Sequence, residues 1–442
     1  MPDRLRRSLV SAVPCALISG GRAVASPSRV QHAAAFTEAL AALNHPDAAV
    51  LLAAGDHEIN NPLVVSGRSG TLEFAPGARL RARNRDVGGV RFVQSCCLTV
   101  VGFRIDWAAP PTTRSHFGAG LMFVDCAETE VRDCGVTDAP GAGLHFDVCQ
   151  RVRVDEVDIA GSSADGVHFA NCTEVIAAGL RTRDTGDDGV ACVDYRSKPA
   201  GSNLSLSRIS VIRSRARGIS VVGSSDVRIS DFSVEQTASS GLLIGEDHHY
   251  RTRRPAGVAI TSGKVSGGGQ FLPSVGNPFG VEVIGADQVE LSEMAVIDPR
   301  SRAVSMVDVG GQVRVSGLSL QTSVQQVPAL ECRSCNQVSL AKVAIVGAPT
   351  LALLVDQCRS LELDGLSVAS PPSARGEIAV QLSSIDKAAI KSVEFRGPVP
   401  GVIRIASDVS GSMLVRTGTN AARIDNQSTR LRLIGTDGGK GV

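Results

Sequence analysis

Short alternations of apolar and polar residues recur along this chain, and glycine and other turn-forming residues interrupt them. The segments VRVDEVDI at 152–159 and VRISDFSV at 227–234 alternate strictly, which is the pattern of a strand with one buried face. Helical heptads and the Leu/Asn consensus of leucine-rich repeats are absent from the sequence. We therefore predict an all-β protein built from many short strands.

A glycine, or alanine in the last copy at 303, is followed by three mostly apolar residues at a fixed interval. The phrase begins at positions 120, 143, 166, 189, 218, 241, 280 and 303, so that successive starts differ by 23, 23, 23, 29, 23, 39 and 23. The two long spacings are the same unit with an insertion. A fixed period in this range is typical of a solenoid, whose units bury apolar faces only against their neighbours. With three short strands per unit, we predict a single-stranded, right-handed parallel β-helix with one repeat per coil.

A ladder of cysteines supports this register. Cys126, Cys149 and Cys172 follow one another at the same interval as the glycine phrase, as do Cys335 and Cys358. A metal or redox site is one interpretation, but no paired-Cys zinc spacing is present. A small apolar residue stacked inside each corner is the favoured interpretation, because a buried cysteine behaves as a small hydrophobe. Stacked thiols point the same way, which disfavours disulfides.

Composition narrows the function classes. The formal net charge of +1 argues against a nucleic-acid partner, and the aromatic content of 3% leaves no stacking platform for single strands. Eleven cysteines form no framework and leave the redox compartment open. No segment after the first 25 residues approaches the roughly 18 apolar residues of a membrane span. We expect a monomer with a carbohydrate partner and neither nucleic acid nor membrane.

The ends of the chain are expected to differ from its middle. Residues 1–25 combine a basic start, an apolar run and small residues at 23–25, which indicates a signal peptide and a secreted or periplasmic protein; a leader without that role is the alternative. Residues 26–442 are then one domain: an N-terminal cap over 26–49, coils over 50–406 and a C-terminal closure over 407–442. The cap contains a predicted helix over 33–43, which would cover an open strand edge. The coils beyond residue 303 are expected to be structural only.

The candidate chemistry lies in two copies of one phrase. Ala-Asp-Gly-Val-His-Phe occupies 164–169 and Asp-Asp-Gly-Val-Ala-Cys occupies 187–192. If one repeat makes one coil, Asp165 and Asp188 stack about 4.8 Å apart, with Asp187 beside them. Like charges this close oppose folding and push their pKa values apart. A fold does not need such a cluster, whereas acid–base catalysis does.

Other polar residues are predicted to surround the three aspartates. His145 and His168 would stack in an outward column beside them, continued by Ala191, Ser220 and Leu243; two histidines in register with carboxylates favour a functional role. Arg217 would lie above Asp188, as its ion-pair partner, as a substrate contact, or as both.

Two insertions and one loop complete the candidate substrate-binding set. Tyr195 and Arg196 belong to the insertion at 194–202, and Glu246 and His248 to the titratable run at 245–255; both segments are expected to border the same cleft. The chain's single tryptophan, Trp107, lies in the run 103–117. It would be either a sugar-stacking platform or a wedge that fixes the loop.

With these residues in place, the chain resembles the β-helical glycoside hydrolases of the polygalacturonase family, family 28. Ala164-Asp165-Gly166 resembles that family's Asn-Thr-Asp-Gly, Gly186-Asp187-Asp188 its Gly-Asp-Asp, and Ala216-Arg217-Gly218 its Gly-His-Gly. The resemblance implies that Asp187 is the general acid and that Asp165 and Asp188 hold the attacking water. The family's uronate-gripping Arg and Lys fall at Leu243 and Gly245 here. The run Arg104–Trp107 with the DG and GDDG phrases is also similar to the β-helical α-galactosidases.

The predicted function is an inverting glycoside hydrolase acting on a poly- or oligosaccharide. Inversion needs two carboxyl groups about 6.5–9.5 Å apart, so Asp187 is expected to face Asp165 and Asp188 across the cleft. No cofactor is required, although an acidic trio can also hold Ca²⁺. The alternatives are a polysaccharide lyase or epimerase acting on a uronan, with Arg217 and Lys198 stabilising the enolate, and a non-catalytic glycan-binding β-helix.

Overall fold

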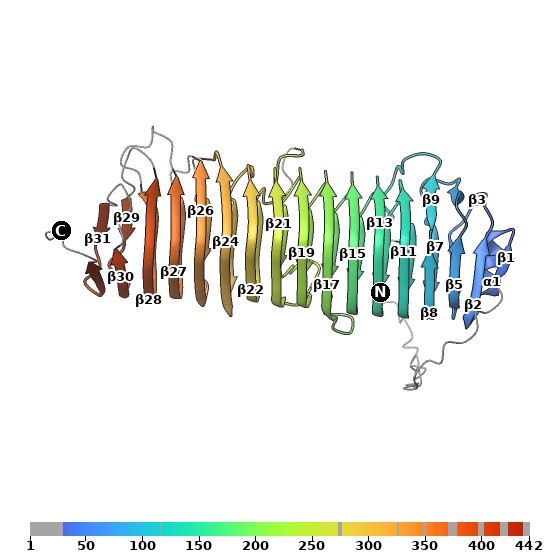
Figure 1. The fold of residues 1–442 in the computed structure, drawn as a ribbon, viewed down its shortest axis with the longest axis horizontal. Coiled ribbons are helices and arrows are strands. Elements are labelled where there is room, and N and C mark those ends of the chain that lie inside the picture. The colour runs from blue at the N-terminus through green and yellow to red at the C-terminus, as the bar shows by residue number, and fades with distance from the viewer. Residues whose placement is uncertain are drawn as a thin grey trace, which may run out of the picture.

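The computed structural model describes residues 30–115, 117–272, 276–324, 327–347, 351–369, 378–396, 402–415 and 423–435. Within these residues the chain is an elongated stack of parallel strands with one short helix at its N-terminal end (Figure 1). The expected signal segment, residues 1–25, lies outside them. Among the helices of this part of the chain, none is long and apolar enough to cross a membrane.

Each regular coil contains a short strand and a long strand, such as β14 (Val167–Ala170) and β15 (Thr173–Arg183). The long strand turns a corner at a residue in the left-handed region, Glu156 (φ 52°) in β13 (Gln150–Ala160) and Gly179 (φ 68°) in β15. It therefore contributes to two faces, and the coil has three faces, as the sequence predicts.

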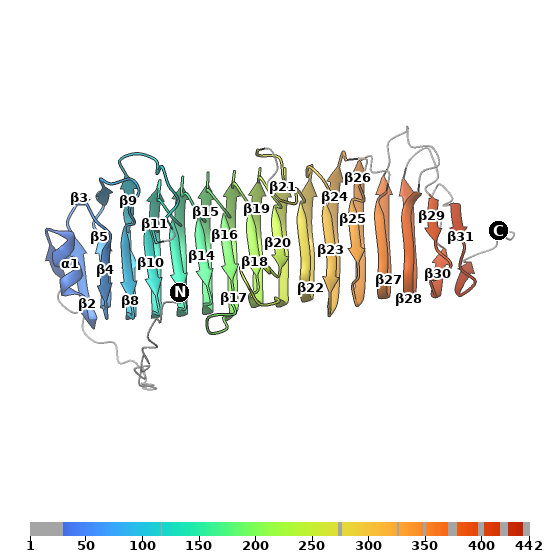
Figure 2. The same ribbon diagram turned by 180° about the vertical axis from the view of Figure 1, so that it is seen from behind.

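The short strands form one face along the length of the molecule (Figure 2). They are β4 (Leu63–Ser66), β7 (Val90–Val93), β10 (Leu121–Val124), β12 (Leu144–Asp147), β14, β16 (Val190–Val193), β18 (Ile219–Val222), β20 (Leu242–Gly245), β23 (Val304–Val309), β25 (Leu330–Arg333), β29 (Val402–Ile405) and β31 (Arg423–Asn426). The longer strands of the regular coils are β11 (Ala127–Thr137), β13, β15, β17 (Ser202–Ile212), β19 (Ser225–Glu235), β21 (Ala256–Ser266), β24 (Gln312–Thr322) and β26 (Gln337–Gly347). In β22 (Val281–Ile297), β27 (Leu353–Ala369) and β28 (Ile378–Arg396) the short and long strands are continuous.

The paired strands in the described residues are parallel, and their register follows the repeat. Leu144 pairs with Val167, and Val167 pairs with Val190, so that a step of one repeat returns the chain to the same position one coil on. Leu144, Val167 and Val190 are fully buried in the lumen. The protein is a right-handed parallel β-helix.

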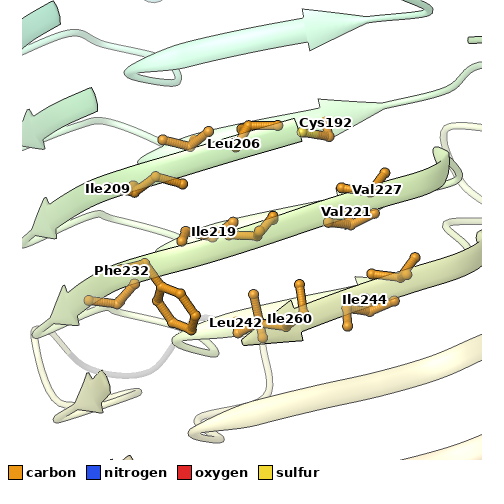
Figure 3. Packing of buried hydrophobic residues seen from close by; sticks show 14 of the residues in the cluster. Cys192, Leu206, Ile209, Ile219, Val221, Val227, Phe232, Leu242, Ile244 and Ile260 are labelled. Atoms are coloured by element: carbon orange, nitrogen blue, oxygen red, sulfur yellow. The ribbon is translucent and has the colours of Figure 1, made fainter. Parts of the chain in front are cut away.

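The interior is a continuous apolar column. Phe92, Phe123, Phe146 and Phe169 stack along it with ring centroids 5.5, 4.9 and 5.4 Å apart. Further along, aliphatic side chains from successive strands meet in the same lumen (Figure 3). Because each ring packs on the next coil, burial of one phenylalanine contributes about 1.5–3 kcal/mol to holding neighbouring coils together. The five predicted corner cysteines are buried, which confirms their structural interpretation.

The N-terminal end is closed by β1 (Gln31–Ala33), α1 (Phe36–Ala42), β2 (Asn44–Leu52) and the strands that follow. These are β3 (Gly55–Ile59), β5 (Ser69–Phe74), β6 (Ala78–Ala82), β8 (Cys96–Val101) and β9 (Arg104–Trp107). The helix is shorter than the predicted 33–43, because Ala33 belongs to a strand that pairs with β2. Phe36 and Leu40 are buried against the first coils, so α1 has the expected capping role.

The C-terminal end differs from the prediction. β30 (Gly411–Val415) pairs with β28 and β32 (Leu431–Gly435) pairs with β30, both in parallel. The coils therefore continue beyond residue 406, where a closing segment was expected. The reason is that this part of the chain keeps inward apolar positions, with Met413 and Leu431 buried.

Candidate active site

The three aspartates converge on one patch at the start of the short strands. Asp165 precedes β14 and Asp188 precedes β16, and these strands are paired neighbours. The backbone N–H of Asp188 donates to Oδ1 of Asp165 at 3.0 Å. One carboxylate oxygen each of Asp165, Asp187 and Asp188 lies within 4.8 Å of the other two. The predicted juxtaposition is confirmed.

Asp165 is held by a histidine of the outward column. Nδ1 of His168 lies 2.5 Å from Oδ2 of Asp165, and both side chains are about nine-tenths buried, 11% and 10% exposed. Burial by itself would raise the pKa of Asp165, but the hydrogen bond and charge of His168 outweigh it and leave that pKa below its usual value. Burial likewise opposes protonation of His168, and the carboxylate of Asp165 nevertheless raises its pKa. The pair is therefore an ionised carboxylate beside an imidazole that tends to carry a proton.

Asp188 has a different environment one coil further on. Its Oδ1 accepts hydrogen bonds from the backbone N–H of Arg217 at 2.8 Å and from Nη1 at 3.4 Å, and its Oδ2 accepts one from Ser220 Oγ at 2.6 Å. Burial raises the pKa of Asp188 to about 6, an effect that Arg217 opposes and the neighbouring carboxylates reinforce. The expected ion pair between Arg217 and Asp188 is therefore present.

Asp187 is the most accessible of the three carboxylates, with 24% of its side chain exposed. Burial and the charge of Asp165 raise its pKa, against the opposing effect of Arg114. Nη2 of Arg114 lies 2.6 Å from Oδ2 of Asp187, and Nη1 of Arg217 lies 4.0 Å from Oδ1. Of the three, Asp187 is therefore the carboxyl group best placed to touch a substrate, and its pKa is shifted in the direction that favours the protonated form.

Arg114 is a site residue that sequence reasoning missed. It belongs to the segment between β9 and β10, which arches over the coil edge in Figure 2. That segment drew notice only for Trp107. The one sequence signal for Arg114 is its position as a cation in an insertion that comes before the acidic repeats. The signal is weak, because no fixed spacing connects a residue of an insertion to a residue of the repeat.

The outward column is confirmed. His145 pairs in register with His168, which pairs with Ala191, which pairs with Ser220. The rings of His145 and His168 lie 4.7 Å apart, and burial followed by the charge of His168 lowers the pKa of His145 well below its usual value. His145 is thus a neutral ring whose Nε2 has no hydrogen-bond partner among the described residues.

Two segments at the other end of the short strands form a border whose parts are joined by hydrogen bonds and an ion pair. Arg253 donates to Asp194 Oδ1 at 2.7 Å and to the carbonyl of Lys198 at 2.8 Å, which joins the run 245–255 to the insertion at 194–202. Lys198 in turn lies 2.6 Å from Asp147 at the end of β12.

Two tyrosines lie in this border. Burial raises the pKa of Tyr195 to about 12, and the nearby charges of Asp165, Tyr250, Asp147 and Asp187 add to the effect. Tyr195 is therefore close enough to Asp165 and Asp187 to feel their charges. Tyr250, 63% exposed, also acts electrostatically on Arg114. Tyr250 is therefore an exposed aromatic side chain of this border, and the sequence pattern singled out its run only for its charges.

The remaining predicted residues of this border pair with one another. Arg196 forms an ion pair with Glu246, and Nδ1 of His248 lies 3.4 Å from the same carboxylate. Only 9% of the Glu246 side chain is exposed, whereas 88% of the His248 side chain is. The contacts of these three are with one another and not with the aspartates, because Glu246 is paired with Arg196 and lies beside His248.

Trp107 is not a sugar-stacking platform. It ends strand β9, is 4% exposed and packs in the main apolar core. Its Nε1 donates to the carbonyl of Val87 at 2.9 Å. Of the two interpretations left open by the sequence, the wedge is correct, because the extended backbone directs this side chain inward.

A cation could be held by the three carboxylates, whose oxygens are the ligand type that Ca²⁺ prefers. Arg114 and Arg217 already supply two positive charges there. A metal ion would have to displace these contacts, so the residues present fit an ion poorly.

The comparison with protein families agrees with the fold. Residues 88–254 match the family described as the right-handed β-helix region. No curated protein sequence matches significantly. The catalytic domain of a GH87 α-1,3-glucanase, solved with nigerose, is similar over 94% of this chain and 69% of its own, at 13% identity and a TM-score of 0.47. The A-module of the mannuronan C-5 epimerase AlgE4 from Azotobacter vinelandii is similar over 83% and 95%, at 14% identity and a TM-score of 0.44.

Proposed function

We propose that the protein is a carbohydrate-active enzyme that hydrolyses a glycosidic bond in a poly- or oligosaccharide. The observation that carries the proposal is the convergence of Asp165, Asp187 and Asp188, with one oxygen of each within 4.8 Å of the others. Their pKa values are pushed apart, lowered for Asp165 and raised for Asp187 and Asp188. One protonated and one ionised carboxyl group are what glycoside hydrolysis requires.

The roles follow from exposure and ionisation. Asp187, accessible and inclined to stay protonated, donates its proton to the leaving glycosidic oxygen. Asp165, ionised, accepts the proton of the water that attacks the anomeric carbon, and Asp188 orients that water. Arg217 and His168 hold these two carboxylates in position.

Inversion is a separate part of the proposal. The nearest oxygens of the three carboxyl groups, within 4.8 Å, are closer than the about 6.5–9.5 Å typical of inverting enzymes. The separation expected between Asp187 and the other two carboxyl groups is therefore not found. The proposal of inversion rests on the resemblance to family 28 alone. Proton NMR of the first-formed anomer tests it directly.

The sugar at this site is proposed to be neutral. Leu243 and Gly245 occupy the coil where the polygalacturonase family places its uronate-gripping cations. Leu243 instead packs with Ala191, Val193 and Val222 in an apolar cluster outside the lumen, against which Tyr195 lies. Neither Leu243 nor Gly245 supplies a cation, so this coil suits a neutral sugar better than a carboxylate.

A screen of reducing-sugar release over a panel of glycans tests the function. The wild type should release sugar from at least one neutral glycan, and Asp187→Asn should not. Asp364→Asn is the matched control, since Asp364 is an exposed aspartate of the distant coils, 54% exposed beside Lys391. Release that is unchanged in Asp187→Asn would refute the assignment.

A uronan lyase or epimerase is the second candidate, favoured by the contact between His168 and Asp165 with Arg217 nearby. A protonated imidazole held by a carboxylate can donate a proton in such a reaction, and a cation can stabilise the enolate. An unsaturated, ultraviolet-absorbing product from a uronan would establish this reaction. Glycan binding unchanged in the triple Asp→Asn variant, with no product from the wild type, would instead identify a binding protein.

A further inference from the structure

Two adjacent cysteines lie at a corner of the β-helix far from the carboxylate patch. Cys96 and Cys97 begin strand β8, and Ala127 at the start of β11 pairs with Cys96. Glu128 therefore occupies the position of Cys97 one coil on. The pairing of strands β8 and β11, and not a loop, therefore places Glu128 next to Cys97.

The corner backbone brings the two thiols together. In a regular strand consecutive side chains point to opposite sides. Cys97 has φ 56° and Glu128 has φ 51°, both in the left-handed region, which interrupts that alternation. As a result Sγ of Cys96 lies 3.2 Å from Sγ of Cys97, and Sγ of Cys97 lies 3.2 Å from Oε2 of Glu128. The three ligand atoms are all within 4.8 Å of one another.

These cysteines differ from the corner ladder. Cys126, Cys149 and Cys172 are buried, and their thiols point at backbone carbonyls. Cys96 and Cys97 are half-buried instead. Cys97 and Glu128 line a surface groove of about 710 Å³, so that solvent reaches this corner.

We propose that Cys96, Cys97 and Glu128 form a binding site for a soft divalent cation, Zn²⁺. Thiolate sulfur and carboxylate oxygen are zinc ligands, and zinc commonly takes four ligands in a tetrahedron. The groove leaves the fourth position to water. Binding releases the thiol protons to solvent, so that two thiolates and one carboxylate face the ion.

A second residue prepares the carboxylate for this role. Nη2 of Arg151, one coil beyond Glu128, lies 3.2 Å from Oε1, whereas Oε2 faces the thiol. The guanidinium thus fixes the carboxylate with one oxygen turned to the ion. Outer partners of this kind are a general feature of metal sites. The site does not depend on the function proposed above.

Cobalt and zinc titration of the full chain tests the proposal. With the thiols reduced and counted, one equivalent of Co²⁺ should give a thiolate-to-metal charge-transfer absorption that Zn²⁺ abolishes. Cys96→Ser with Cys97→Ser should remove the absorption, and Glu128→Gln should weaken Co²⁺ binding by at least about tenfold. Glu174→Gln should change nothing, since Glu174 is exposed at the same corner two coils beyond Glu128, with φ 57°.

Several results would overturn the proposal. One is the absence of charge-transfer absorption from protein whose thiols are all reduced. Another is absorption that survives in the double serine variant. A third is a protein whose mass before reduction is lower by two hydrogens and which, once reduced, takes up no metal. That result would identify a disulfide between Cys96 and Cys97 instead of a metal site. Circular dichroism checks that the double serine variant folds. If that variant does not fold, the test is Glu128→Gln, and unchanged Co²⁺ affinity in Glu128→Gln would overturn the proposal.

Discussion

The coils that carry the aspartates and the coils near the C-terminus share one architecture and differ in chemistry. In both, a short strand stacks on the next with a step of one repeat, and the same alternate positions fill the lumen. The residue before the repeat glycine is Asp165 and then Asp188 in the first region. At the same place in the C-terminal coils stand Pro328 and Leu351. The fold therefore does not need acidic residues there.

The number of carboxyl groups that share one patch separates the functional cluster from a structural one. Glu331, a buried acid of the C-terminal coils, lies 2.7 Å from Arg302 and 3.1 Å from Arg333. The C-terminal coils therefore do contain a buried charged residue, although the sequence predicted a purely structural role for them. The carboxylate of Glu331 there faces two guanidinium groups. Around Asp188 three carboxylates share one patch with two guanidinium groups and the His168 imidazole. Three carboxyl groups whose nearest oxygens lie within 4.8 Å and whose pKa values are pushed apart are the feature that points to catalysis.

The largest effect is expected from neutralising the general acid. Asp187→Asn should lower kcat by about 10²–10⁴-fold, the range that general acid–base catalysis supplies. Glu331→Gln, in the other region, should leave kcat unchanged, although it removes a buried ion pair and lowers stability. Assays of both variants on the same glycan test the comparison, and an equal loss of activity would break it.

The next effect is on stability. A rise in the pKa of Asp188 from 3.8 to about 6 corresponds to up to about 3 kcal/mol of destabilisation once the group ionises. The folded state holds the proton more tightly than the unfolded state, so this penalty is absent below about pH 4 and complete above about pH 6.

Asp188→Asn should therefore be more stable than the wild type at pH 7, and the difference should shrink at pH 4. Urea unfolding at the two pH values measures it. A stability difference that does not change with pH would show that Asp188 is not strained by its ionisation.

The first residue of the repeat phrase also differs between the two regions, because the coils that carry the aspartates have no room there for a Cβ atom. A Cβ on Gly166 would lie 2.5 Å from the carbonyl oxygen of Gly189, whereas the C-terminal coils accommodate Ala329 at the equivalent position. Gly166→Ala should cost about 1–3 kcal/mol, typical of overpacking. Ala329→Gly should cost about 0.5–1 kcal/mol by chain entropy. Equal costs in thermal unfolding would contradict the closer approach of the catalytic coils.

Arg114 should set the pH dependence of the reaction. Its guanidinium favours the ionised form of Asp187, so Arg114→Met should raise the pKa of Asp187 further. The acid would then keep its proton to higher pH, and the alkaline limb of kcat/KM should move upward. Arg114→Lys should restore most of the wild-type profile, since it keeps the charge. An upward shift of the acid limb instead would mean that Asp187 acts in its ionised form.

The smallest effect distinguishes the two candidate aromatic platforms. Tyr250→Ala should raise KM roughly fivefold, about 1 kcal/mol, by removing an exposed aromatic contact. Trp107→Phe should leave KM unchanged and lower stability by about 1 kcal/mol, the worth of its lost hydrogen bond to Val87. A KM effect from Trp107→Phe alone would reverse this assignment.

The sequence by itself determined the β-helix, its register and the convergence of Asp165 with Asp188. This was predictable because each coil of a solenoid contacts only its neighbours, so one period converts separation along the chain into position in space. The same rule placed His145, His168 and Arg217 beside the carboxylates.

Only the tertiary structure decided how the non-periodic segments meet the coils. The insertion that carries Trp107 directs Arg114 onto Asp187, and the run 245–255 presents Tyr250 while Glu246 is bound by Arg196. The adjacent thiols at residues 96–97 approach one another through a local left-handed backbone. The path of an insertion depends on which surface it packs against, and no repeat in the sequence encodes that choice.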